Sequence, residues 1–121
     1  MAEAVLFDLA SLPEDSPMPL LTRRRVMGER CMLSAVTLEP GFVLESHSHE
    51  NEQIVVMLSG RCVFGLGAPG SPEHREVEVA GGQALLLPSN VPHSCRALER
   101  TSILDVFSPP SATTGVDRPR G

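Results

Sequence analysis

The stretch GFVLESHSHENEQIVVMLSG, residues 41–60, carries two histidines and a glutamine between apolar runs and is bounded by glycines. His47 and His49 are two residues apart, so on an extended backbone both side chains leave the same face and their imidazoles can converge on one ion. Gln53 shares that face if the extended backbone continues. A His-x-His pair alone is weak evidence for a metal, so it needs support from elsewhere in the chain.

A second stretch, GQALLLPSNVPH at residues 82–93, supplies that support. His93 ends a proline-rich turn and starts the next strand-like segment, where a rigid turn can aim the imidazole inward. The candidate ligands of one divalent metal ion are therefore His47, His49, Gln53 and His93. This mixed nitrogen and oxygen set admits Zn, Ni, Fe, Mn or Co.

Short apolar segments of strand length recur from Val26 to Phe107 and predict an all-β domain. Turn sequences separate these segments at residues 40–41, 59–60, 67–72, 81–82 and 88–92. The 121 residues include four Phe, no Trp and no Tyr, so we expect a mainly aliphatic core. A sandwich or barrel fits the pattern, and a barrel removes the edge strands that invite aggregation.

The expected organisation is an N-terminal arm at residues 1–20, a barrel at 21–108 and a flexible tail at 109–121. The arm begins with a strand-forming apolar run, Val5–Leu9, which cannot bury its own side chains. This run could pair with a neighbouring barrel, which predicts a homodimer, or fold onto its own barrel. The tail is rich in Pro, Ser and Thr and lacks a core-forming pattern.

Charge and hydropathy exclude several classes of partner. A net charge of -5 and a pI near 5.3 argue against nucleic acid. The short basic run Arg23–Arg25 is expected on a solvated strand or loop face. Glu3 and Asp8 stand where a signal peptide would carry basic residues, and no apolar run is long enough to span a membrane. We therefore expect a cytoplasmic protein with a small-molecule partner.

Three cysteines, Cys31, Cys62 and Cys95, lie in apolar runs without CxxC spacing. An odd number without that spacing indicates buried, reduced thiols. Cys95 is two residues after His93, so a thiolate ligand or nucleophile is an alternative role for it.

Both histidine stretches resemble the motifs of the cupin family, with Gln53 where the first motif usually has Glu. The matching spacings are Gly41-x5-His47-x-His49-x3-Gln53-x6-Gly60 and Gly82-x5-Pro88-x-Asn90-x2-His93. The resemblance implies a double-stranded β-helix, the jelly-roll barrel of cupins, with the four candidate ligands on one metal. Four neutral ligands leave the full dipositive charge on the ion, which suits a Lewis acid that polarises a carbonyl or enol oxygen.

Asp105 interrupts the apolar run ILDVF at residues 103–107. Aspartate is disfavoured in strands unless its charge is needed. The alternation does not decide whether Asp105 faces the core or the solvent, since apolar residues stand on both faces.

The segments HSHENEQ (47–53), NVPH (90–93) and DVFSPP (105–110) together resemble the pectin-degradation cupins, which linearise unsaturated monouronates. The resemblance implies that Asp105 transfers a proton and that Phe107 faces the substrate. That family has an arginine directly after the last segment, whereas this chain has Ser111. Such an arginine would be a natural partner for a uronate carboxylate.

Three functions therefore remain open from the sequence. The first is a metal-dependent isomerase, cyclase or lyase, in which Asp105 moves a proton. The second is a cupin dioxygenase, which would need a redox metal and consume oxygen. The third is a non-catalytic protein that binds metal and a small ligand. The fold itself hosts many activities and does not choose among them.

Overall fold

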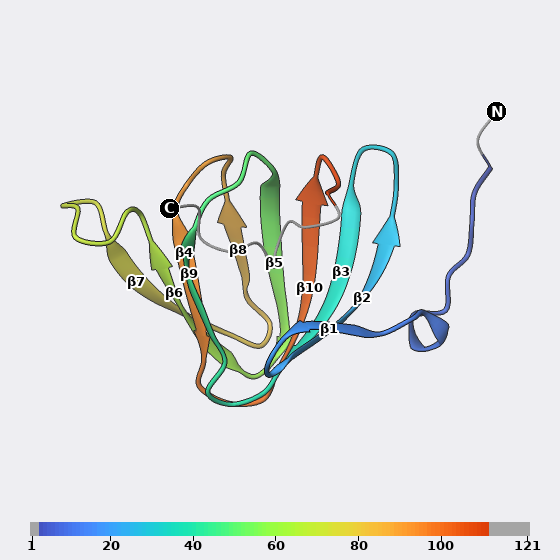
Figure 1. Ribbon diagram of the computed structural model, residues 1–121, viewed down its shortest axis with the longest axis horizontal. Helices are drawn as coiled ribbons and strands as arrows, with labels where there is room; N and C mark the ends of the chain where they lie inside the picture. Colours follow the sequence, from blue (N-terminus) through green and yellow to red (C-terminus); the bar gives the residue numbers. More distant parts are fainter. Residues whose placement is uncertain (1–2, 112–121) are drawn as a thin grey trace.

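Two antiparallel sheets face each other in the computed structural model, which describes residues 3–111 (Figure 1). The six-stranded sheet has the order β1-β2-β3-β10-β5-β8, and the four-stranded sheet has the order β4-β9-β6-β7. The strands are β1 (Asp15–Met18), β2 (Leu21–Met27), β3 (Met32–Leu38), β4 (Val43–His47), β5 (Glu52–Ser59), β6 (Arg61–Leu66), β7 (Arg75–Ala80), β8 (Ala84–Leu87), β9 (His93–Ala97) and β10 (Thr101–Ser108). The prediction of an all-β jelly-roll barrel is confirmed.

Side-chain alternation along the strands builds the core between the sheets. In β3, every second residue from Met32 to Leu38 is buried, and the residues between them are more exposed. Val55 and Met57 of β5 meet Phe64 of β6 in the same cluster. Burial of such side chains contributes roughly 25 cal/mol per Å² of apolar surface, so the aliphatic strands themselves supply the driving force for closure.

Every predicted turn lies between two strands of the described chain. Gly60 shows why one of them requires glycine. Its φ is +88°, and a Cβ there would approach the Arg100 carbonyl oxygen to 2.4 Å. The turn before His93 contains Asn90 with φ 65°. Asparagine is among the few residues that adopt this left-handed conformation at low cost.

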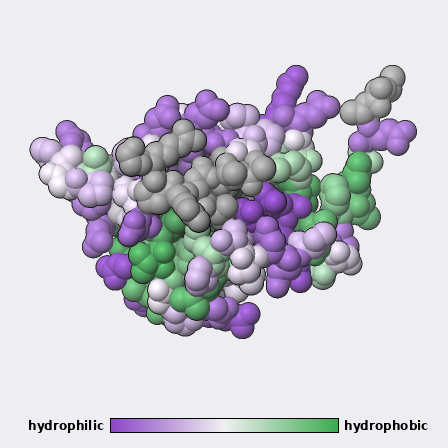
Figure 2. Space-filling view, viewed as in Figure 1, coloured by the Kyte–Doolittle hydropathy of each residue, from purple (hydrophilic) through white to green (hydrophobic). Residues whose placement is uncertain are grey.

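The N-terminal segment differs from its prediction. Val5–Leu9 forms no strand, and its last residue begins a 3₁₀ helix, η1 (Leu9–Ser11), with Asp8 as the N-cap. The strand β1 forms instead in the Pro-rich part of the predicted arm and pairs with β2. Figure 2 shows hydrophobic side chains along the projecting arm, where Leu6 is 97% exposed.

The predicted tail comprises residues 109–121, and its part from residue 112 onward lies outside the described residues. Within residues 3–111, the structure contains no helix that is long and apolar enough to cross a membrane.

Candidate active site

Three histidine side chains meet at one end of the barrel. His47 is the last residue of β4, His49 lies in the following loop, and His93 is the first residue of β9. His47 and His93 are direct partners in the β4–β9 ladder. Each imidazole offers one nitrogen, and these three atoms lie within 4.8 Å of one another. A single cation could therefore contact all three rings.

The hydrogen bonds of the three rings select the same tautomer. Each Nδ1 faces a backbone carbonyl oxygen two residues away: that of Glu45 at 3.0 Å, of Asn51 at 3.0 Å and of Val91 at 2.9 Å. A carbonyl only accepts hydrogen bonds, so each Nδ1 carries the proton and each Nε2 keeps its lone pair. This arrangement fixes the ring orientation and leaves Nε2 suited to a metal.

His93 remains neutral well below neutral pH. Burial lowers its pKa to about 4, and the neighbouring His47 and His49 act in the same direction. A neutral imidazole is the form that coordinates a metal, so this ring does not have to lose a proton at pH 7 before binding one.

Gln53 faces the histidines from the opposite sheet. Its side chain lies on β5 and lines the same cavity as His47 and His93. Its amide nitrogen donates a 3.0 Å hydrogen bond to Asp105. This bond identifies which amide atom is the nitrogen, so the other atom is the oxygen, Oε1. Among the described residues, Oε1 of Gln53 and Nε2 of His49 are buried without a hydrogen-bond partner.

A buried polar atom without a partner costs free energy, and a cation among the three histidines would satisfy Nε2 of His49. The residues present therefore fit a metal, on the evidence of their own hydrogen bonding. Whether Gln53 coordinates that metal remains a prediction.

The candidate ligands do not lie on one extended strand from His47 to Gln53, as the sequence analysis considered. The chain leaves β4 at His47 and turns through residues 48–51 before β5 begins at Glu52. His49 and Gln53 thus do not share one strand face: His49 follows β4 of the four-stranded sheet, whereas Gln53 lies on β5 of the six-stranded sheet. The backbone N–H of Asn90 donates to the His49 carbonyl oxygen at 2.8 Å, which ties this loop to the turn before His93.

Asp105 lies inside the barrel, which resolves the ambiguity of its strand. It lines the cavity together with Ile103 and Phe107, whereas Leu104 and Val106 lie on the other face of β10. Burial raises the pKa of Asp105 to about 7, and the hydrogen bond from Gln53 opposes that rise. The group can therefore exchange a proton near neutral pH.

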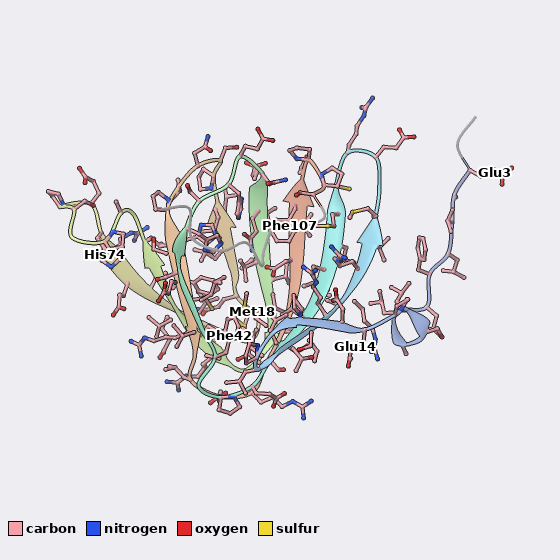
Figure 3. The ribbon with its side chains drawn as sticks, viewed as in Figure 1. Glu3, Glu14, Met18, Phe42, His74 and Phe107 are labelled. Atoms are coloured by element: carbon pink, nitrogen blue, oxygen red, sulfur yellow. The ribbon has the colours of Figure 1, made fainter. Side chains whose placement is uncertain are left out.

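Phe107 forms part of the cavity wall beside the histidines. Its side chain is buried, and its ring centroid lies 6.0 Å from that of His49 in an edge-to-face arrangement. Phe107 pairs with Gln53 across the β10–β5 ladder. Figure 3 shows Phe107 within the barrel and His74 on the β6–β7 hairpin, away from this region.

The cavity itself has a volume of about 50 Å³ and is partly open to solvent. Its wall is mostly apolar, with a few polar side chains: Arg23, Ser34, His47, Gln53, His93 and Asp105.

Arg23 is the charged lining residue that the sequence interpretation missed. The expected solvated face is wrong for this side chain, which is 7% exposed and hydrogen-bonded to Asp15. Strand alternation could have found it, because Arg23 lies two residues after the buried Leu21. Arg24, on the other face, fits the expectation better and pairs with Glu14.

The cysteines take no part in the histidine cluster. Cys95 lines the cavity, but a hydrogen bond with Cys62 and burial raise its pKa well above the usual value, which keeps the thiol protonated. Within residues 3–111, the side chains close enough together to hold a metal ion are those of His47, His49 and His93, and no cysteine belongs to this group. Cys31 is exposed, which corrects the expectation that all three thiols are buried.

Comparison with known proteins gives a family and several similar structures. The family model described as a cupin domain matches residues 34–107, more than half of the chain. A search of curated proteins finds no match. The structure of KdgF from Halomonas sp. is 24% identical, covers 91% of this chain and 97% of its own, and has a TM-score of 0.78.

Two oxalate decarboxylases are similar over part of their length. The enzyme from Lactobacillus farciminis, as a formate complex, is 18% identical over 95% of this chain and 36% of its own, with a TM-score of 0.81. The enzyme from Bacillus subtilis at pH 4.6 is 23% identical over 84% and 28%, with a TM-score of 0.74. This chain therefore spans about a third of those proteins, and at these identities the likeness concerns the fold.

Proposed function

The chain belongs to the cupin family, and on that basis we propose that it is a metal-dependent enzyme of the isomerase, cyclase or lyase type. One observation carries the proposal: the carboxyl group of Asp105, hydrogen-bonded to Gln53 inside the barrel, lines the same cavity as His47 and His93. An ionisable side chain placed beside a candidate metal site is typical of catalytic sites.

The proposed roles follow from the contacts of each side chain. His47, His49, Gln53 and His93 would hold one divalent metal, which when bound supplies a Lewis acid for a carbonyl or enol oxygen. Asp105 takes up or delivers a proton at the substrate carbon. Gln53 holds Asp105 in position through its 3.0 Å hydrogen bond, and Phe107 forms the wall against which the substrate lies.

An unsaturated monouronate is the first substrate class to test, because three sequence segments resemble the pectin-degradation cupins. The KdgF structure from Halomonas sp. matches this chain over nearly its full length, which is compatible with that choice. The neutral ligand set favours Lewis acid chemistry over a dioxygenase, since no carboxylate among the ligands would stabilise a higher oxidation state.

We further propose a cytoplasmic homodimer, in which unpaired cysteines would stay reduced.

The test begins with metal analysis of the purified protein. The metal-loaded chain is then incubated with an unsaturated monouronate, and loss of the conjugated double bond is followed by absorbance. Turnover that stops after chelation and returns with metal supports the proposal. Oxygen consumption coupled to substrate loss would favour the dioxygenase, and ligand binding without any turnover would favour a binding protein.

A further inference from the structure

A buried arginine faces the cavity from the side of β2. The Arg23 side chain is 7% exposed, whereas that of its partner Asp15 is 51% exposed. Asp15 comes from β1, an edge strand of four residues, and pairs with Arg23 across the β1–β2 ladder. A buried charge is costly without a partner, so Arg23 depends on an anion that reaches it from the edge of the barrel.

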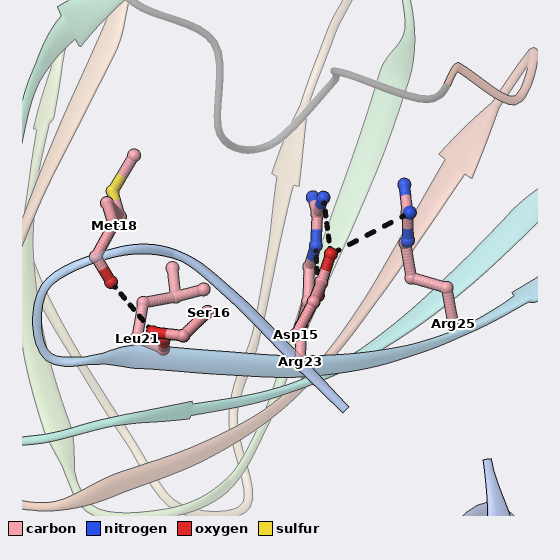
Figure 4. A network of polar contacts seen from close by, with 6 residues as sticks. All are labelled: Asp15, Ser16, Met18, Leu21, Arg23 and Arg25. Atoms are coloured by element: carbon pink, nitrogen blue, oxygen red, sulfur yellow. Dashed lines mark hydrogen bonds and ion pairs between the residues drawn. The ribbon is translucent and has the colours of Figure 1, made fainter. Parts of the chain in front are cut away.

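Asp15 uses only part of the guanidinium. Nε of Arg23 donates to Oδ1 at 2.9 Å, and Nη2 donates to Oδ2 at 3.2 Å. A guanidinium has five N–H donors, and within the described residues Nη1 of Arg23 makes no hydrogen bond. Figure 4 shows the Asp15 carboxylate between Arg23 and Arg25, whose Nη2 lies 4.0 Å from Oδ2.

The strand register connects this arginine to the proposed proton-transfer residue. Arg25, Ser34 and Asp105 are neighbours in one row across β2, β3 and β10. Arg23 lies in the next row, opposite Val36, and both line the cavity. β2 and β10 flank β3, so their backbones are roughly 10 Å apart. A substrate a few carbon atoms long can therefore touch the Arg23 side chain and Asp105 together.

We propose that Arg23 binds the carboxylate of an anionic substrate, and that Asp15 occupies the same guanidinium when no substrate is present. This inference rests on the proposed function, which supplies the reaction. It adds the substrate class, a small carboxylic acid. A substrate carboxylate offers the same two-oxygen geometry as Asp15 and can replace it or share the guanidinium through Nη1. Arg23 would thereby supply, from β2, the positive charge that Ser111 does not provide after β10.

The experiment compares galacturonate with galactose, which differ at one carboxylate, by calorimetric titration of the metal-loaded protein. The wild type should bind galacturonate more tightly than galactose. Arg23→Met should weaken galacturonate binding by about ten- to a hundredfold, which is typical of a lost charge-assisted contact. Galactose binding should not change, because it lacks the carboxylate.

Asp15→Asn separates a ligand-binding role from a structural one. If Asp15 competes for Arg23, this variant should bind galacturonate severalfold more tightly than the wild type. If the pair only holds β1 on β2, both variants should weaken binding together or leave it unchanged, and either result overturns the proposal. Arg24→Met is the matched control, since Arg24 lies on the same strand and pairs with Glu14 outside the cavity.

A second variant covers the possibility that Arg23→Met does not fold. Arg23→Lys keeps the positive charge but loses the two-point geometry, so it should retain the fold and bind galacturonate with intermediate affinity. Wild-type affinity in Arg23→Lys, or equal affinity of the wild type for both sugars, overturns the proposal. Turnover of an unsaturated monouronate is measured separately. Binding through Arg23 without turnover contradicts the proposed function alone, whereas turnover with an unchanged KM in Arg23→Met contradicts this inference alone.

Discussion

The side-chain amide of Gln53 donates a 3.0 Å hydrogen bond to the carboxylate of Asp105, joining β5 to β10 inside the barrel. This bond leaves Oε1 of Gln53 buried without a partner among the described residues. One amide therefore orients the candidate proton-transfer group with its nitrogen and offers its oxygen to a cation. A change at either residue should affect both functions of the pair, unless the change preserves the hydrogen bond.

Asp105→Asn preserves that bond, because the new amide oxygen can still accept from Gln53. The variant should keep its metal but lose about two to four orders of magnitude in kcat, the usual contribution of a positioned general base. Metal content by elemental analysis and kcat on the confirmed substrate check both parts. Full activity in this variant would return the chain to the binding-protein alternative.

His93→Ala should release the metal and leave a folded barrel, because the aliphatic core rather than the ion supplies most of the stability. His74→Ala is the matched control, since this histidine bonds the Gly67 carbonyl oxygen on the β6–β7 hairpin. Elemental analysis and circular dichroism of the two variants give the comparison. Stoichiometric metal in His93→Ala would remove His93 from the proposed ligands.

The turns and the histidine cluster could be predicted because they depend on local chemistry. Gly60 occupies a left-handed conformation that its sequence neighbours already indicate, and His93 follows a proline-rich turn. The shared face of His49 and Gln53 was conditional on a continuous extended run, and that run does not form, because β4 ends at His47 and β5 begins at Glu52. The two residues belong to segments of different sheets, which no spacing within residues 47–53 indicates.

The faces of Asp105 and Arg23 could not be predicted for a different reason. Leu104 and Val106 are apolar although they lie outside the cavity, so the alternation in β10 carried no information about Asp105. Arg23 is charged, so the sequence predicts an exposed side chain. Its ion pair with Asp15 offsets the free-energy cost of burying the charge. That partner belongs to β1, a strand in a Pro-rich segment that the sequence pattern did not predict.

The N-terminal arm predicts how the chain associates. Val5 is 68% exposed and Leu6 is 97% exposed, and burial of one leucine contributes about 1.5–3 kcal/mol. We expect a dimer by light scattering and a monomer for Leu6→Asp. Leu86→Asp, at a 55% exposed position on β8, is the control and should leave the dimer intact. A monomeric wild type at high concentration would instead support an arm that packs on its own barrel.

The Asp15–Arg23 pair predicts a specific dependence of stability on acidity. The hydrogen bond from Arg23 holds the pKa of Asp15 below its ordinary value of 3.8. A lowered folded-state pKa stabilises the protein above the unfolded-state value, and this contribution is lost as the pH falls through the folded-state value. Asp15→Asn should therefore lower the free energy of unfolding by about 1 kcal/mol at pH 7, a modest figure because half of the carboxylate is exposed to screening solvent. The difference in the free energy of unfolding between the variant and the wild type should shrink as the pH falls below 3.8. Urea denaturation at pH 7 and at a pH below 3.8 measures this difference. A difference that stays constant with pH would mean that the ionised carboxylate does not hold β1 against β2.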